Sequence, residues 1–356
     1  MAEPAPVGAP AHVDSQWLRL LPKAEVHVHV EGCVPLAVVG LVPADAKFRD
    51  LASFLGFLDR SCGLVTDAAQ LRAIACGIAE RAAANGVRHV DVIVNPSHWP
   101  AWRGRLAEML AALDGGFCEA EQTAAVTVAV CVSLLRTQAP AEAESLVDWL
   151  VEHRCRRVVG LSIDGDEAAA GASSRRFAPL FEQARIAGLR TCAHAGESSG
   201  PAGVRDALDL LHAERIDHGV RAAEDHALVV ELAQRGTPLD ICPTSNVRLG
   251  VVESLAAHPL EPMRRAGVAI SINTDDPLLF GCDVVGEYER CATTFGWDRA
   301  VAGAVARTSI DSCFASDERR AELRHELDAF LVRSADPSAP APSLAAPSPS
   351  RHRGGA

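Results

Sequence analysis

The segment AEVHVHV, residues 24–30, is the first of eight short runs that decide the fold. It alternates valines with polar residues, as a β-strand does. Seven further β-branched or apolar runs follow, at residues 87–94, 125–132, 158–163, 190–194, 215–218, 238–242 and 268–273. The eight runs therefore predict eight strands.

Stretches rich in Ala, Leu, Glu and Arg with helical spacing lie between these runs, for example at residues 67–86, 141–155, 173–188 and 223–236. Several of the stretches end in a glycine, which a helix C-terminus favours, namely Gly86, Gly188, Gly236 and Gly267. Strand and helix alternating eight times predicts an α/β fold, a single (β/α)₈ TIM-type barrel with extra helices. An open doubly wound sheet is disfavoured, because no G-x-G-x-x-G motif follows the first run.

The two ends of the chain have a different composition from the middle. Residues 1–15 are rich in Ala and Pro, and residues 334–356 are rich in Pro, Ala and Ser. We expect both to be disordered tails. Residues 16–333 contain no linker of that composition, so we expect them to form one domain.

The composition also limits the partners. The chain has 356 residues and a formal net charge of −12, which disfavours a nucleic-acid surface and favours a small-molecule substrate. No apolar run approaches 18 residues and the N-terminus has no signal-peptide pattern, so we expect no membrane contact. The 11 cysteines form no C-x-x-C pair, which is typical of reduced thiols in the cytoplasm. No pattern indicates an oligomeric state.

Residues of reactive types end several of the predicted strands, where the active site of such a barrel lies. His27 and His29 belong to the first run, and side chains at i and i+2 of a strand share one face. His194 ends the fifth run, and Asp275 follows the eighth. Three imidazoles and one carboxylate, with a position left for water, are typical of a catalytic metal site. The pattern therefore predicts a site for zinc or a similar divalent ion.

Three further residues suit the proton transfers that such a site needs. A catalytic metal lowers the pKa of its bound water from about 15.7 to about 7. Glu197 follows a predicted ligand, and partial burial would raise its pKa and make it an acid. His218 could be a further ligand, a core histidine or a group that orients the attacking water, and we favour the last. Coordination of Asp275 would leave Asp276 free to hydrogen-bond to the substrate.

These motifs, in this order, resemble those of the adenosine deaminase family of the metal-dependent amidohydrolase superfamily. The matching segments are PKAEVHVHVEG (22–32), GLSIDGDE (160–167), HAGE (194–197), DHG (217–219), CPTSN (242–246) and NTDDP (273–277). The resemblance implies a (β/α)₈ barrel that holds one zinc ion. It also implies an enzyme that hydrolyses a 6-aminopurine to the 6-oxo compound and ammonia. The H-x-E and P-C-x-x-C signature of the cytidine and tRNA-type deaminases is absent.

The resemblance assigns a role to each motif residue. The implied zinc ligands are His27, His29, His194 and Asp275. Glu197 would protonate purine N1, and His218 would orient the hydroxide that attacks C6. The backbone N–H of Gly165 would bind N3, and Asp276 would hold N7.

Two segments depart from the family pattern. Glu31 stands where family members that act on adenosine generally have an Asp that contacts the ribose 5′-hydroxyl. A Glu at this position is similar to the residue of the family branch that acts on free adenine, although it could also bind a different sugar substituent. The segment that normally supplies a helical lid is short, so Phe54, Leu55 and Phe57 form either a reduced lid or a core-facing helix stripe.

We expect adenosine or 2′-deoxyadenosine as substrate, with adenine or a modified adenine nucleoside as the alternative. Hydrolysis of another amide or amidine bond is disfavoured, because Gly165, Glu197 and Asp276 together suit N3, N1 and N7 of a purine. A non-catalytic purine-binding relative would have lost the acid or a ligand, and neither is lost. Trp99 and Trp102 are either a stacking wall of the pocket or anchored loop aromatics.

Overall fold

The computed structural model describes residues 13–40, 48, 50–171 and 174–335. Within them, eight parallel strands form one sheet whose spatial order is the order in the chain. The strands are β1 (Lys23–His29), β2 (Val87–Val94), β3 (Thr127–Leu135), β4 (Val158–Asp164), β5 (Arg190–Ala195), β6 (Arg215–His218), β7 (Leu239–Ile241) and β8 (Ile270–Ile272). Each overlaps one of the eight predicted runs, and the predicted (β/α)₈ barrel is confirmed.

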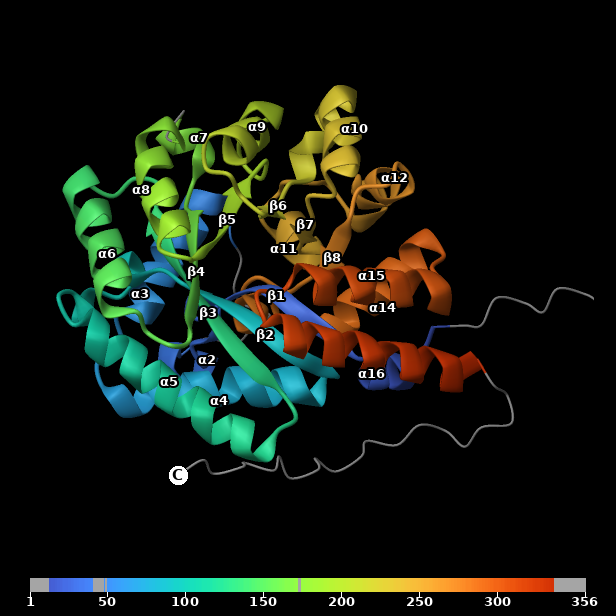
Figure 1. The fold of residues 1–356 in the computed structure, drawn as a ribbon, viewed down its shortest axis with the longest axis horizontal. Helices are drawn as coiled ribbons and strands as arrows, with labels where there is room; N and C mark the ends of the chain where they lie inside the picture. The colour runs from blue at the N-terminus through green and yellow to red at the C-terminus, as the bar shows by residue number, and fades with distance from the viewer. Residues whose placement is uncertain (1–12, 41–47, 49, 172–173, 336–356) are drawn as a thin grey trace, which may run out of the picture.

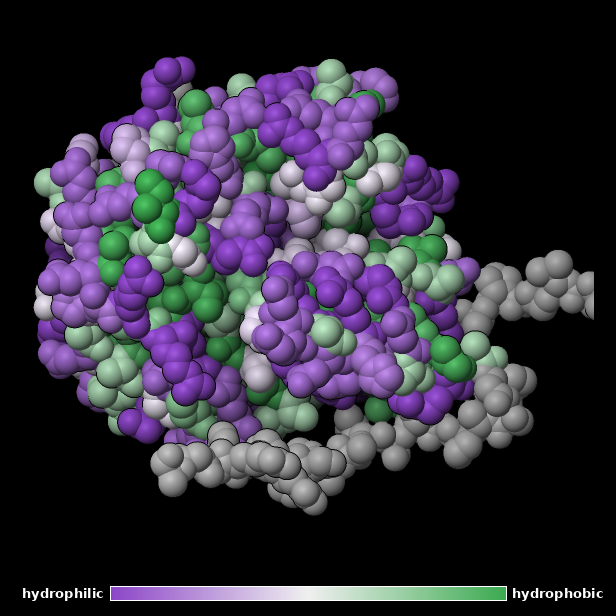
Figure 2. All heavy atoms as spheres, viewed as in Figure 1, coloured by the Kyte–Doolittle hydropathy of each residue, from purple (hydrophilic) through white to green (hydrophobic). Residues whose placement is uncertain are grey.

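Helices connect the strands and surround the barrel (Figure 1). The longer ones are α3 (Leu51–Cys62), α4 (Ala68–Ala84), α5 (Leu106–Thr123), α6 (Pro140–His153), α8 (Ser174–Ile186), α10 (His226–Arg235), α14 (Val284–Phe295), α15 (Arg299–Ser312) and α16 (Asp317–Ala335). The shorter ones are α1 (Ser15–Leu20), α2 (Leu36–Val39), α7 (Glu167–Ala170), α9 (Pro201–Asp209), α11 (Pro243–Arg248), α12 (Leu260–Arg265) and α13 (Pro277–Phe280). Figure 2 shows that hydrophilic side chains cover most of the viewed face. None of the helices that the structure describes combines the length and the apolar composition needed to cross a bilayer.

The barrel closes between β1 and the segment that follows β8. The backbone N–H of His29 donates to the carbonyl of Asp275 at 2.8 Å, and the N–H of Asp275 donates to the carbonyl of His27 at 3.0 Å. The side-chain oxygen of Asn273 accepts from the N–H of Val26 at 2.8 Å. Closure of the barrel therefore places Asp275 beside both histidines of β1.

The barrel also contains a buried, positively charged side chain. Arg215, the first residue of β6, is fully buried, and its guanidinium lies 2.6 Å from Asp91 and 2.9 Å from Asp240. The ring of Phe314 covers the guanidinium at 3.9 Å. Two carboxylates and an aromatic face offset the cost of burying this charge. The carbonyl of Asp240 contacts Nδ1 of His27 at 3.1 Å, so the network reaches the first histidine of β1.

The ends of the described chain are helical. Helix α1 begins at Ser15, the last residue of the predicted N-terminal tail, and the side chain of Asp14 caps it. Helix α16 continues to Ala335, two residues beyond the predicted domain end at 333. The rest of the two predicted tails, residues 1–12 and 336–356, lies outside the described residues.

Candidate active site

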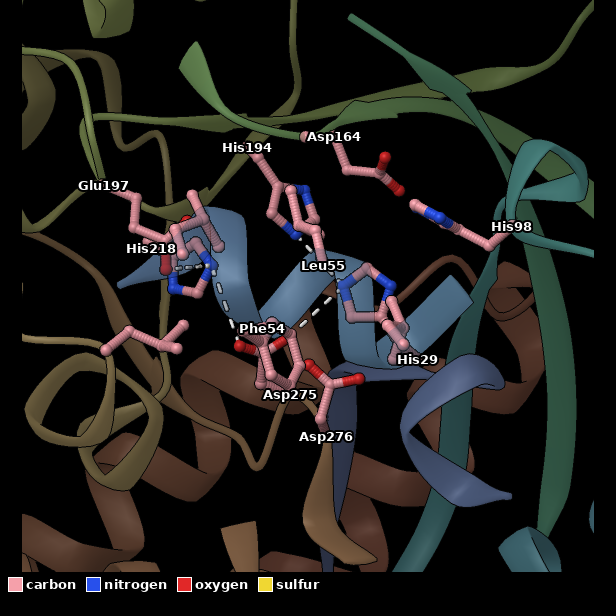
Figure 3. Close-up of a pocket in the computed structure, with 14 residues that line it drawn as sticks. His29, Phe54, Leu55, His98, Asp164, His194, Glu197, His218, Asp275 and Asp276 are labelled. Carbon is pink, nitrogen blue, oxygen red and sulfur yellow. Dashed lines mark hydrogen bonds and ion pairs between the residues drawn. The ribbon is translucent and has the colours of Figure 1, made fainter. Parts of the chain in front are cut away.

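A cavity opens at the C-terminal ends of the strands (Figure 3). Most of its polar walls come from the motif residues, and helix α3 supplies much of its apolar wall. The residues that line it are His29, Leu51, Phe54, Leu55, Leu58, His98, Asp164, Gly165, His194, Glu197, His218, Leu249, Asp275 and Asp276.

The four predicted metal ligands converge at the base of this cavity. Nε2 of His194 lies 3.2 Å from Nε2 of His27 and 3.1 Å from Nε2 of His29. Oδ1 of Asp275 lies 3.5 Å from Nε2 of His27 and 3.3 Å from Nε2 of His29. Four ligands placed about 2 Å from one ion in a tetrahedron lie about 3.3 Å from each other. The four side chains, all buried, therefore fit a small divalent ion.

The surroundings of these ligands also fit a metal centre. Nδ1 of His27 contacts the carbonyl of Asp240, and Nδ1 of His194 lies 3.2 Å from Oδ2 of Asp217. Such partners orient an imidazole so that its other nitrogen faces the ion. The hydroxyl of Ser245 donates to Oδ2 of Asp275 at 2.7 Å, which leaves Oδ1 directed at the histidines.

A second group of ligand-type atoms, from His27, His218, Cys242 and Asp275, shares two members with the first. Sγ of Cys242 lies 3.4 Å from Nδ1 of His27, the nitrogen that faces the Asp240 carbonyl. The first group fits an ion better, because its three imidazoles all point their Nε2 atoms at one place.

Two of the site residues have strained backbones. His218 and Asp275 have φ angles of 68° and 63°, in the left-handed region that residues with a Cβ rarely adopt. His218 ends β6 and Asp275 lies three residues after β8, and each turns its side chain into the cavity, where Figure 3 shows both. Strain of this kind persists where a functional side chain must be aimed.

The loop that carries Glu197 is anchored by Glu167, the first residue of α7. The Glu167 carboxylate accepts from the backbone N–H groups of Gly196, Glu197, Ser198 and Ser199 at 2.9–3.2 Å, and from the Ser199 hydroxyl at 2.6 Å. Sequence reasoning missed this residue, although it belongs to the GLSIDGDE segment. It gives the loop after β5 a fixed shape.

Glu197 is buried beside His218, with its Oε1 atom 3.5 Å from the Nε2 atom of that ring. Burial raises the pKa of Glu197 well above its ordinary value, and the negative charges of Asp275 and Glu167 raise it further. The raised pKa favours the protonated form of the side chain, which a general acid needs.

Asp276 lies across the cavity from the loop of Glu197. Its pKa is raised well above the ordinary value by burial and by the adjacent charge of Asp275. The 3₁₀ helix η1 (Glu31–Cys33) approaches it closely, since a Cβ on Gly32 would lie 2.1 Å from its Oδ1 atom. A side chain at residue 32 would displace Asp276, which explains the glycine there.

Asp164 and Gly165 end β4 at the cavity wall. Oδ1 of Asp164 accepts from Nδ2 of Asn95 at 2.5 Å, whereas its buried Oδ2 has no hydrogen-bond partner within the described residues. Gly165 has φ +92°, a turn that favours glycine. Sequence reasoning identified Gly165 but missed Asp164, whose signal was its position as the last residue of a strand.

Glu31 does not belong to the cavity lining. Its Oε1 atom accepts from the backbone N–H of Asn95 at 2.8 Å and from Nε1 of Trp99 at 2.6 Å, and burial raises its pKa to about 7. Trp99 and Trp102 are buried behind the cavity wall and line none of it. The structure thus favours the anchored-aromatic interpretation of both tryptophans.

Helix α3 covers one side of the cavity. Leu51, Phe54, Leu55 and Leu58 line it, whereas Phe57 does not. Phe54 also stacks on Phe280 with 5.1 Å between ring centroids. Both predicted roles of this segment therefore apply in part. The same face of α3 packs on the core, as a core-facing stripe would, and borders the cavity, as a reduced lid would.

His98, which sequence reasoning missed, forms another part of the wall. It lies in the 3₁₀ helix η3 (Pro96–His98) after β2 and is hydrogen-bonded to Asp59 of α3 at 2.6 Å. Although burial opposes it, this bond raises the pKa of His98 above its ordinary value. The pair ties α3 to the β2 side of the cavity.

Comparison with known proteins identifies the family. The model of the adenosine deaminase family matches residues 33–330. The chain belongs to this family. One curated relative is the adenine deaminase of Rhodospirillum rubrum, which is 34% identical to this chain over 333 residues. The match covers 89% of this chain and 99% of the relative.

Two solved structures superpose closely on this barrel. Adenine deaminase from Arthrobacter aurescens is 31% identical with a TM-score of 0.81, covering 88% of this chain and 99% of its own. An amidohydrolase from Burkholderia ambifaria with bound Zn is 29% identical with a TM-score of 0.79, covering 92% and 99% of the two chains. The chain is therefore a hydrolytic deaminase that acts on an aminopurine.

Proposed function

We propose that this protein is a zinc-dependent deaminase of free adenine, which it hydrolyses to hypoxanthine and ammonia. Adenosine, the substrate that we expected from the motifs, is not supported by the comparisons. The relatives named adenine deaminase support the free base.

One observation carries this proposal. Six buried carboxyl oxygens lack a hydrogen-bond partner within the described residues, and three of them belong to residues that line the cavity, namely Oδ2 of Asp164, Oε1 of Glu197 and Oδ1 of Asp276. A buried polar atom without a partner is costly, so three in one cavity indicate a ligand with matching polar groups.

The hydrogen-bonding pattern of these groups matches adenine. N1, N3 and N7 of the base accept, and N9–H donates. Glu197 and Asp276 have raised pKa values, so each can donate a proton or a hydrogen bond, to N1 and N7. The N–H of Gly165 remains the predicted donor to N3.

Asp164 distinguishes the base from its nucleoside. It precedes Gly165 in the chain, and N9 is separated from N3 by one ring carbon, so a residue adjacent to the N3 donor can reach N9. The free Oδ2 atom of Asp164 accepts from N9–H of adenine. Adenosine has a sugar on N9 and no hydrogen to donate, so it would leave this carboxylate unpaired.

The residues then perform the reaction as follows. The three histidines and Asp275 would hold the zinc ion, which when bound would supply a water molecule that is acidic near neutral pH. Glu197 protonates N1, which makes C6 electrophilic, while His218 orients the water whose oxygen bonds to C6. The Glu197 carboxylate takes up one proton of that water. The second proton passes from the new C6 hydroxyl to the amino group, the C6–N bond breaks, ammonia leaves, and the 6-oxopurine keeps the hydrogen on N1.

Two further parts of the proposal concern zinc and location. We propose one zinc per chain, since the four ligand atoms meet at one place. All eleven cysteines of the chain are free, which supports the reducing cytoplasm as the location.

The test compares adenine with adenosine in the zinc-loaded wild type and in Asp164→Asn. In the variant, the amide oxygen can stay with Asn95 while its NH₂ group faces N9–H. We expect kcat/KM for adenine to exceed that for adenosine in the wild type. Asp164→Asn should lower kcat/KM for adenine about 10-fold to 100-fold, as for the loss of a hydrogen bond to a charged group. Asp148→Asn, an exposed change on α6, is the matched control. Faster turnover of adenosine, or an unaffected Asp164→Asn, would refute the choice of substrate.

A further inference from the structure

A chain of hydrogen bonds leads from His218 away from the cavity. Nδ1 of His218 lies 3.2 Å from Nδ2 of Asn246 in α11, and Oδ1 of Asn246 lies 3.2 Å from Nε2 of His258. Nδ1 of His258 lies 3.1 Å from the backbone nitrogen of Leu260, in the first turn of α12. The three side chains are at most 2% exposed. No solvent competes for these bonds.

The backbone N–H of Leu260 fixes which group donates and which accepts in each hydrogen bond of this series. A backbone N–H can only donate, so Nδ1 of His258 must accept and carries no hydrogen. Burial lowers the pKa of His258 to about 4, which agrees with a neutral ring. The single hydrogen of His258 is therefore on Nε2 and is donated to Oδ1 of Asn246.

The orientation of the Asn246 amide then determines whether Nδ1 of His218 donates or accepts. Because its oxygen accepts from His258, the group that faces His218 is the NH₂ group, which donates to Nδ1. The hydrogen of the His218 ring is then on Nε2. That atom faces the cavity, 3.5 Å from Oε1 of Glu197 and 4.0 Å from Oδ2 of Asp275.

We propose that His258 is a positioning residue of the reaction, which acts through Asn246 to hold His218 in the tautomer with hydrogen on Nε2. This inference rests on the deaminase function proposed above. His218 thus presents an N–H group, and not a lone pair, to the reacting water. It donates to the water oxygen and orients a lone pair of that oxygen toward C6.

The tautomer can be observed directly. In zinc-loaded protein labelled with ¹⁵N in its histidines, long-range ¹H–¹⁵N correlations identify which ring nitrogen carries hydrogen, and the signals absent from His218→Gln belong to His218. We expect hydrogen on Nε2 in the wild type. Asn246→Asp places an acceptor at Nδ1 and should move the hydrogen to Nδ1. A wild-type His218 with hydrogen on Nδ1, or an unchanged pattern in Asn246→Asp, would overturn the proposal.

Kinetics test the consequence for catalysis. Asn246→Asp should lower kcat for adenine by about 10³-fold or more, as expected for a catalytic histidine held in the wrong tautomer, with KM little changed. His258→Phe removes the donor to Asn246 and should lower kcat by about 10-fold to 100-fold. His226→Gln, at the exposed start of α10, is the control and should match the wild type.

The two measurements separate this proposal from the function on which it rests. If no form of the protein deaminates a purine, the proposed function fails, while the wild-type spectrum still decides the tautomer. If Asn246→Asp does not fold, His258→Phe provides the test, because it should give His218 a mixture of both tautomers. Wild-type kcat and a wild-type spectrum in His258→Phe would contradict a positioning role.

Discussion

The carboxylate of Glu167 accepts a 2.9 Å hydrogen bond from the backbone N–H of Glu197. The same carboxylate holds three neighbouring N–H groups and the hydroxyl of Ser199. A residue at the end of the β4 loop thus shapes the β5 loop that carries the acid. The position of Glu197 depends on a contact between residues 30 positions apart.

Replacing Glu167 by Gln should therefore misplace the acid. One oxygen becomes an NH₂ group that faces backbone N–H donors, so the loop over residues 196–199 must shift. A displacement of about 1 Å at a reacting group costs about 10²-fold in rate, and we expect a loss of that order in kcat for adenine. Glu182→Gln on α8, which affects only a partly exposed ion pair with Arg185, is the control. Wild-type kcat in Glu167→Gln would show that the anchor does not position the acid.

Replacing Glu197 by Gln should remove proton transfer but keep the metal. Gln cannot protonate N1, so kcat should fall by about 10²–10⁴-fold, the usual contribution of a general acid. Glu197 is not one of the four converging ligands, so zinc per chain measured by elemental analysis should equal that of the wild type. Loss of zinc in this variant would instead make Glu197 part of the metal centre.

The pH dependence should follow the protonation of Glu197. Burial, with the charges of Asp275 and Glu167, raises its pKa, so the pH range in which the acid is protonated and active extends upward. Activity should be present below this pKa and be lost as the pH rises through it. The basic limb of kcat/KM against pH measures this pKa. Glu167→Gln removes one negative charge, so its basic limb should lie at lower pH. A limb at higher pH in that variant would contradict the assignment.

Asp217 should affect metal binding without touching the metal. Its Oδ2 atom lies 3.2 Å from Nδ1 of His194, and removing such a partner typically costs about 10-fold to 100-fold in metal affinity. We expect Asp217→Asn to weaken zinc binding by that factor in competition with a chelator. Asp209→Asn, an exposed change on α9, is the control. Equal zinc affinity in Asp217→Asn and the control would exclude this role.

Much of the fold could be predicted from the sequence, because its signals are local. Each strand overlaps a short β-branched or apolar run, and several helices end in glycine, so the alternation was visible without any contact information. Parallel strands bring their C-terminal ends together, which is why His27, His29, His194 and Asp275 could be grouped although 248 positions separate the first from the last.

The rest of the site depends on contacts that no local pattern encodes. Glu167 and His258 act through hydrogen bonds to loops from other parts of the chain. Glu31 stays a predicted substrate contact, and in the structure its Oε1 atom accepts from Nε1 of Trp99. Whether the Glu31 side chain faces the substrate or Trp99 depends on how η1 packs against the loop after β2. Asp164 could have been suspected only from its place at a strand end.

The most direct test of the account is the reaction itself. Zinc-loaded protein should convert adenine to hypoxanthine and release one ammonia for each base consumed, and chelation of the metal should stop the reaction until zinc is restored. Absorbance of the purine ring and an ammonia assay on the same sample measure both products. Release of no ammonia from adenine, adenosine or any related 6-aminopurine by the zinc-loaded protein would contradict the central claim.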